Sequence, residues 1–87
     1  MISSVMVTVK IAGEKAAHDM ELPAEITIKE LSPKLLMALK NIESKLFLGV
    51  EATKIKLGTN NRYLKDDEVL VTAGVWDGSI ITVERVV

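Results

Sequence analysis

Few side chains in this sequence are of the types that catalyse reactions or bind metal ions, and their spacing matches no known catalytic or metal-binding motif. The chain has one histidine, His18, and no cysteine, so it lacks both a thiolate nucleophile and the ligands of a zinc site. The acidic run Asp66-Asp67-Glu68 lacks the spaced oxygens, glycine and distal glutamate of a calcium loop. We interpret the run as a solvated turn able to cap a helix, and His18 as a partly buried edge residue. No catalytic, cofactor-binding or metal-binding residue is expected, and the chain is not expected to be an enzyme.

Trp76 is a candidate for protein binding, because the chain has only three aromatic residues. It precedes Asp77-Gly78, a pair typical of turns. Tryptophan is enriched at binding hot spots, so Trp76 could anchor a partner. The alternative is a ring that lies over the edge of the core. The same two interpretations apply to Phe47 and Leu48.

Charge and hydropathy narrow the class of partner. The 87 residues carry 11 basic and 12 acidic side chains, a net charge of -1, which argues against a general nucleic-acid or anionic-membrane surface. No apolar stretch approaches the ~20 residues that span a bilayer. The start, Met1-Ile2-Ser3-Ser4, does not resemble a signal peptide. We expect one domain over residues 1–87, cytoplasmic, cofactor-free and without direct membrane insertion.

Two alternating segments predict a β-hairpin near the start of the chain. Residues 4–12 place four apolar side chains on one face of a strand. Residues 17–23 alternate in the same way, with His18, Met20 and Leu22 on one face, and Pro23 ends the strand. The polar stretch around Gly13 suits the connecting turn. The inward set of the first strand is Val5, Val7, Val9 and Ile11.

The hydrophobic period then changes to that of a helix. An apolar stripe recurs every three or four residues from Ile28 to Ile42. Thr27 and Glu30 form a capping box that favours a start at Ile28. Pro33 complicates this, because inside a helix it removes one hydrogen bond; the alternative start has Pro33 at the first helical position. We favour the earlier start, and we expect the helix to end between residues 43 and 48. The stripe comprises Ile28, Leu31, Leu35, Leu39 and Ile42.

The remaining sequence returns to strands. A short strand holds Ile55 and Leu57, residues 58–61 supply a turn, and Tyr63-Leu64 suggest a brief return strand. Leu70 and Val75 are expected in the core. The last strand is expected over residues 79–86, with Ile81 and Val83 inward. The order β-β-α-β-β-β predicts an α+β fold: a mixed sheet of four to five strands packed on one amphipathic helix, with the first and last strands central.

The outward faces of these two central strands are not purely polar. If the strands adjoin, their apolar side chains form a patch on the face away from the helix, and such patches mark interaction sites. The alternative is ordinary filling of strand positions. Lysines at the rim of this face would add charge selectivity. The candidate partner-binding residues are Trp76, Ile80, Thr82, Met6, Thr8 and Lys56.

Over almost its whole length the chain resembles the ubiquitin-like β-grasp fold. The stretches that carry the likeness are "LPAEITIKEL", "TKIKLGTNNRYL" and "VLVTAGVWDGSIITV". Within the fold the chain is similar to the YukD-like family, bacterial ubiquitin-like proteins associated with type VII (WXG100) secretion. The resemblance implies a non-catalytic accessory protein that binds a secretion component, either membrane-embedded machinery or its cytoplasmic ATPase. The alternative is a small auxiliary subunit of a multicomponent enzyme, as in bacterial monooxygenases.

Two departures from ubiquitin shape the functional expectation. The sequence closes on Glu84-Arg85-Val86-Val87 where conjugated relatives carry Gly-Gly, so conjugation and sulfur transfer are not expected. Lys56 falls where ubiquitin has its central exposed isoleucine, so the standard ubiquitin-receptor surface is not expected either. No motif specifies the partner or the oligomeric state.

Overall fold

Two apolar strands that are far apart in the sequence lie side by side in the middle of one sheet. The computed structural model describes residues 3–58 and 61–87. Strand β1 (Ser4–Ile11) pairs in parallel with β4 (Ile80–Val86), with Thr8 beside Ile80. The edge strands β2 (Ala17–Pro23) and β3 (Ala52–Leu57) each pair antiparallel with a central strand, giving the order β2-β1-β4-β3. The predicted mixed sheet with central first and last strands is confirmed.

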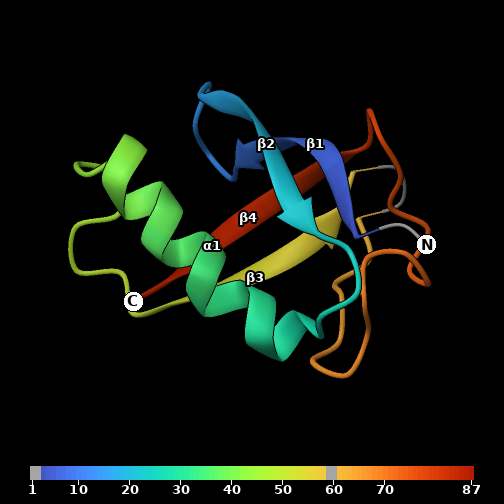
Figure 1. Ribbon diagram of the computed structural model, residues 1–87. Helices are drawn as coiled ribbons and strands as arrows, with labels where there is room; N and C mark the ends of the chain where they lie inside the picture. Colours follow the sequence, from blue (N-terminus) through green and yellow to red (C-terminus); the bar gives the residue numbers. More distant parts are fainter. Residues whose placement is uncertain (1–2, 59–60) are drawn as a thin grey trace.

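The one helix of the described residues, α1 (Ile28–Ile42), crosses one face of this sheet (Figure 1). It begins where the capping box predicts: Thr27 is the N-cap, and its hydroxyl accepts a hydrogen bond from the Glu30 amide at 3.3 Å. Pro33 therefore lies inside the helix, and the alternative start at this proline is wrong. The helix ends at Ile42, with Glu43 as its C-cap, one residue before the expected range of 43–48.

The acidic run caps α1 through its backbone. The Ile28 amide donates to the Glu68 carbonyl at 2.8 Å, and the Lys29 amide donates to the Asp66 carbonyl at 3.0 Å. These bonds satisfy amides of the first helical turn, which have no partner within a helix. The prediction that this segment could cap a helix is confirmed, although it does so with carbonyls and not with carboxylates.

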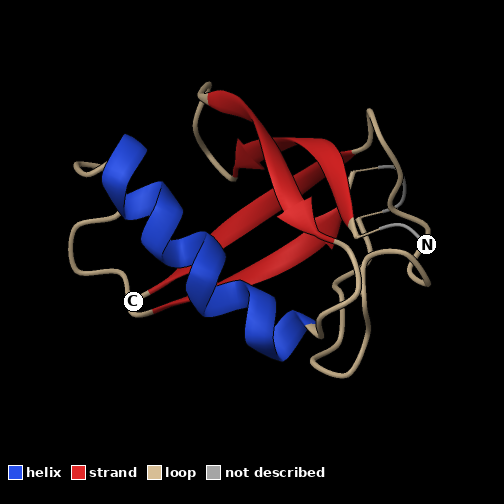
Figure 2. Cartoon of the chain, viewed as in Figure 1, coloured by secondary structure: helices blue, strands red, loops and turns tan. Residues whose placement is uncertain are grey.

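The core lies between α1 and the facing side of the sheet (Figure 2). All four inward residues of β1, the inward pair of β4, and the plugs Leu70 and Val75 are at most 2% exposed. Of the two residues that could belong either to the core or to a binding surface, Phe47 is buried in the core, whereas Leu48 is 86% exposed. The buried set is Val5, Val7, Val9, Ile11, Leu22, Ala24, Ile28, Leu31, Leu35, Leu39, Phe47, Val50, Ile55, Leu64, Leu70, Val75, Ile81 and Val83.

Ile42 does not complete the buried stripe; it is 49% exposed. Glu43 follows Leu39 by four residues and takes the next position on that face, where its carboxylate lies 3.1 Å from Nε2 of His18. The helix thus ends on a polar contact with β2.

The predicted return strand at Tyr63-Leu64 is only an isolated bridge between Tyr63 and Lys56, so the sheet has four strands in the described part of the chain. Of the predicted turn at residues 58–61, Thr59 and Asn60 lie outside the described residues. Asn61 has a positive φ of 56°, as expected of a turn asparagine. In the described ranges, no helix is long and apolar enough to cross a membrane.

The helix supplies a matched pair of variants for the core. Leu35→Ala removes a side chain that is 1% exposed and should lower the free energy of unfolding by ~3 kcal/mol, through lost burial and a cavity. Met37→Ala, at a position 69% exposed in the same helix, should change it by less than ~0.5 kcal/mol. Urea unfolding followed by circular dichroism measures both. Equal losses would show that α1 does not bury the stripe described.

Candidate functional site

The sheet face opposite α1 carries most of the candidate binding residues. Because β1 and β4 adjoin, Thr8 lies beside Ile80, and Thr82 lies between Lys10 on β1 and Lys56 on β3. Outward residues of neighbouring strands therefore form rows across the face. The first condition for the predicted patch, adjacency of the two strands, is met.

Trp76 lies in a short turn that is fastened to β1 at Met6. The Met6 amide donates to Oδ1 of Asp77 at 2.9 Å, and the Gly78 amide donates to the Met6 carbonyl at 2.8 Å. Gly78 has a positive φ of 88°, a conformation that favours glycine. The Trp76 amide donates to Oγ of Ser79 at 2.9 Å. These bonds hold the tryptophan backbone at one end of the sheet face.

The apolar residues at this end are half exposed. Trp76 is 52% exposed, Met6 48% and Ile80 43%, so each retains apolar surface available for contact. We call these three residues the Trp76 end of the sheet face. Trp76 is thus neither fully buried nor fully exposed, which fits both a ring that lies over the edge of the core and an anchor for a partner.

The rest of the face is polar, and the patch is not continuous along the strands. The Thr8 hydroxyl donates to the Asp19 carboxylate at 2.8 Å. Nζ of Lys56 lies 3.0 Å from the Glu84 carboxylate, and the Tyr63 hydroxyl donates to the same carboxylate at 2.6 Å. Of the candidate residues, Thr8, Thr82 and Lys56 therefore lie in or beside polar contacts, apart from the Trp76 end.

Tyr63, Lys56 and Glu84 form a coupled group that the sequence analysis missed. The hydrogen bond to the Glu84 carboxylate raises the pKa of the Tyr63 hydroxyl. The Tyr63 hydroxyl and then Lys56 lower the pKa of Glu84, whose hydrogen bond in turn raises the pKa of Lys56. The ammonium groups of Lys54 and Lys56 lie 5.7 and 5.3 Å from the Tyr63 ring centre. The group ties the 61–64 segment to the sheet.

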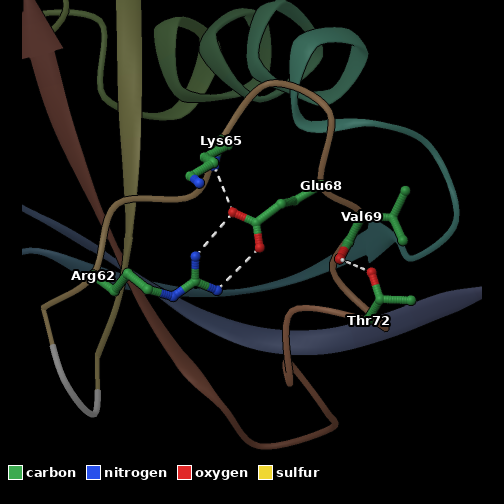
Figure 3. Close-up of polar contacts among 5 residues, drawn as sticks. All are labelled: Arg62, Lys65, Glu68, Val69 and Thr72. Carbon is green, nitrogen blue, oxygen red and sulfur yellow. Dashed lines mark hydrogen bonds and ion pairs between the residues drawn. The ribbon is translucent and has the colours of Figure 1, made fainter.

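A second carboxylate fixes the loop that caps α1. Figure 3 shows Glu68 between Arg62 and the backbone of Lys65. Its carboxylate accepts from Nη1 and Nη2 of Arg62 at 2.9 and 3.0 Å and from the Lys65 amide at 2.7 Å. The Arg62 guanidinium, followed by the Lys65 amide, lowers the pKa of Glu68. This bidentate contact fixes the loop through Glu68.

The other candidate for chemistry is a structural contact too. His18 and Glu43 are 3.1 Å apart, with side chains 33% and 25% exposed, which matches the predicted partly buried edge histidine. Among the residues that the structure describes, no group of three or more His, Cys, Asp or Glu side chains could hold a metal ion.

Comparison with known proteins identifies a protein family that this chain matches. The family model described as "WXG100 protein secretion system (Wss), protein YukD" matches residues 6–83. A search of curated proteins finds no match.

Solved structures show the ubiquitin-like fold. The ubiquitin-like domain of the Mycobacterium tuberculosis type VII secretion protein EccD1 has a TM-score of 0.75 at 22% identity, covering 95% of this chain and 99% of that domain. A chain of the "MycP5-free ESX-5 inner membrane complex, State II" has a TM-score of 0.77 at 20% identity, covering 98% of this chain; our chain spans only 21% of its length. A chain of the "Toluene 4 monooxygenase HD Complex with Inhibitor 4-Bromobenzoate" has a TM-score of 0.70 at 7% identity, covering 97% and 100% of the two chains.

The single tyrosine makes the Tyr63 contact directly measurable. Near-ultraviolet absorbance of the tyrosinate should titrate above the ordinary tyrosine pKa of about 10. Glu84→Gln should return the midpoint toward that value, because the amide has no charge to oppose ionisation. Glu25→Gln, an exposed position away from this group, should leave it unchanged. A wild-type midpoint at or below the ordinary value would contradict the contact.

The hydrogen bond between Tyr63 and Glu84 should stabilise the fold at neutral pH. This stabilisation should be lost as the pH rises through the raised pKa of Tyr63.

The Glu68 contact predicts an acid dependence of stability. Since its folded pKa is lowered, its contribution is present above the unfolded pKa and is lost as pH falls through the folded value. Glu68→Gln should cost ~1 kcal/mol of unfolding free energy at pH 7. Wild type and variant should converge between about pH 5 and pH 3 in thermal or urea unfolding. A gap that stays constant over this range would rule out ionisation of Glu68 as the cause.

Proposed function

The chain belongs to the YukD family of the WXG100 protein secretion system, and we propose that it serves a type VII secretion system as a non-catalytic ubiquitin-like adaptor that binds another protein. The family match over residues 6–83 is the observation that carries this proposal. Proteins of the same fold have many different functions, so the link to type VII secretion rests on the family match and not on the fold.

The chemistry of the described surface supports binding in place of catalysis. The two carboxylates whose pKa is lowered, Glu68 and Glu84, are both engaged in contacts that hold loop 61–69 in place. Catalytic groups are ordinarily found in a cleft with pKa values matched to proton transfer. Here the shifts stabilise ionised carboxylates on a sheet face and in a cap.

The partner in our proposal is a component of the secretion machinery, either membrane-embedded or its ATPase, contacted from the cytoplasmic side. A chain of the ESX-5 inner membrane complex contains a region of the same fold, which supports a place for such a domain beside membrane machinery. The proposed contact uses the Trp76 end of the sheet face, where a tryptophan and two aliphatic side chains are half exposed. Thr8, Thr82 and Lys56 would form its polar rim.

The contact is proposed to be non-covalent. Two residues in the last part of β4 are fixed to the body of this domain. Nη1 of Arg85 donates to the Leu46 carbonyl at 3.0 Å, and the Glu51 amide donates to the Val86 carbonyl at 3.1 Å. The alternative of a monooxygenase subunit has the support of a shared fold alone, and we do not propose it.

Secretion by a strain lacking this gene tests the function. Wild type should restore export of WXG100 proteins into the culture medium, read by immunoblot. Trp76→Ala and Ile80→Lys should reduce export and weaken recovery of the machinery on affinity purification about tenfold or more, as expected for a binding hot spot. Leu48→Ala, at a position 86% exposed outside the sheet, is the matched control and should behave as wild type.

Two results would count against this account. Normal export from the deletion strain would remove the secretion role. Equal export with all three variants, at equal protein levels, would remove the Trp76 end as the contact while leaving the role in place.

A further inference from the structure

A groove runs between α1 and the edge strand β3, away from the Trp76 end. It consists of three hollows that share walls. The first, of about 380 Å³, is lined in part by Tyr63 and shares Ser32 and Thr53 with the second, of about 120 Å³. The second shares Pro33 and Leu36 with the third, of about 230 Å³, which is bounded by Met37 and Lys40. The shared residues place the three hollows next to one another along α1, the third being lined by residues of α1 alone.

The length and lining of this groove suit a short extended peptide. Its helical wall runs from Ile28 to Lys40, about 18 Å at the rise of an α-helix. Extended chain advances about 3.3 Å per residue, so roughly five or six residues would fill it. The walls are largely apolar, and Met37 on the rim is 69% exposed.

The edge of β3 along this groove is only half covered. On the side away from β4, the Leu57 amide donates to the Arg62 carbonyl and the Leu64 amide donates to the Ile55 carbonyl, both at 2.9 Å. For Ala52–Lys54, the only strand partner in the described ranges is β4. A strand edge left open in this way can accept another strand by backbone hydrogen bonding.

The floor of the groove contains an unsatisfied polar group. Oγ1 of Thr53 is buried and has no hydrogen-bond partner within the described structure. Thr53 lines both of the first two hollows. A buried hydroxyl without a partner costs ~1–3 kcal/mol, so this part of β3 carries an unfavourable polar group beside the hollows.

Charge selects among possible occupants. Lys54 and Lys65 line the wide end and Lys40 the other, and none of the three forms an ion pair in the described residues, although the Lys54 ammonium lies 5.7 Å from the Tyr63 ring centre. The acidic lining residues are Asp66, next to Lys65, and Glu51 midway. A second copy of this chain would bring two lysine-bearing edges together, which is unfavourable. A segment with apolar residues in its middle and carboxylates at its ends is complementary.

We propose that this groove binds an extended segment of a partner protein, acidic at both ends and apolar at alternate central positions, which adds as a strand to the open half of β3. The site is separate from the Trp76 end, and it does not depend on the proposed secretion role. It would let the domain hold two partners, or two parts of one partner, at once.

A defined peptide tests the site: acetyl-Asp-Glu-Val-Ser-Ile-Thr-Val-Asp-Glu-amide, titrated into isotope-labelled protein and followed by amide chemical shifts. Saturable shifts should map to residues 32–40 and 52–54. A peptide with lysines in place of its four acids, and one with proline in place of the central isoleucine, should each bind about tenfold more weakly or worse, through lost charge pairing and lost strand pairing.

Variants of the groove locate the contact. Thr53→Arg should fill the groove and abolish the shifts. Met37→Glu, which changes an exposed residue and so should not perturb folding, should weaken binding about tenfold through repulsion of the acidic ends. Ile80→Lys on the sheet face is the control and should bind as wild type.

Four results would overturn the proposal. Three come from the peptides: an absence of saturable shifts, shifts centred on the Trp76 end, and equal binding of the lysine peptide. The fourth is loss of binding in Ile80→Lys with retention in Met37→Glu. None of these outcomes bears on whether the domain serves secretion, so the two proposals fail separately.

Discussion

The parallel pairing of β1 with β4 is the constraint on which the rest of this molecule depends. These strands are separated by residues 12–79, so their pairing joins the two ends of the described chain across the hairpin, helix and β3 that lie between them in sequence. Their inward residues, from Val5 on β1 to Val83 on β4, are nearly all inaccessible to solvent and form the floor on which α1 packs. Without β4, both β1 and β3 would lose a neighbour, and the sheet would separate into a hairpin and a lone strand.

The same pairing determines which surfaces are available for binding. One sheet face is covered by α1, so binding must use the opposite face, the loops or the edges. On the opposite face the polar group of Tyr63, Lys56 and Glu84 occupies the β3 side, which leaves apolar exposure at the Trp76 end. The 61–69 loop, fixed by Glu68, covers half of the β3 edge and leaves the other half beside the helix. The Glu68 and Glu84 carboxylates, which could suggest catalysis, hold the 61–69 loop in place beside these surfaces.

Local patterns predicted the elements well, because their signals are short-range. Alternation identified β1 and its inward residues, and the Thr27 capping box placed the start of α1 correctly despite Pro33. Leu70 and Val75, expected in the core from the segment between the 61–64 turn and the last strand, are fully buried. Ile42 was wrongly expected in the buried stripe, because helical spacing does not show where the covered part of the helix ends. Glu43 occupies the next position on the buried face, opposite His18.

The contact of Tyr63 with Glu84 depends on the β3–β4 register, which no local pattern specifies. The candidate patch was less continuous than expected for the same reason, since strand parity does not reveal that lysines flank Thr82 on both sides.

The central claim is that this domain works by non-covalent contact with secretion machinery through a preformed surface. Site-specific photo-crosslinking in living cells tests it most directly, with a photoreactive residue at position 76 and, as a control, at exposed position 25. The account predicts adducts between position 76 and a component of the secretion machinery, and none of the same adducts from position 25. Adducts at position 76 only with proteins outside that machinery, or identical adducts from both positions, would contradict it.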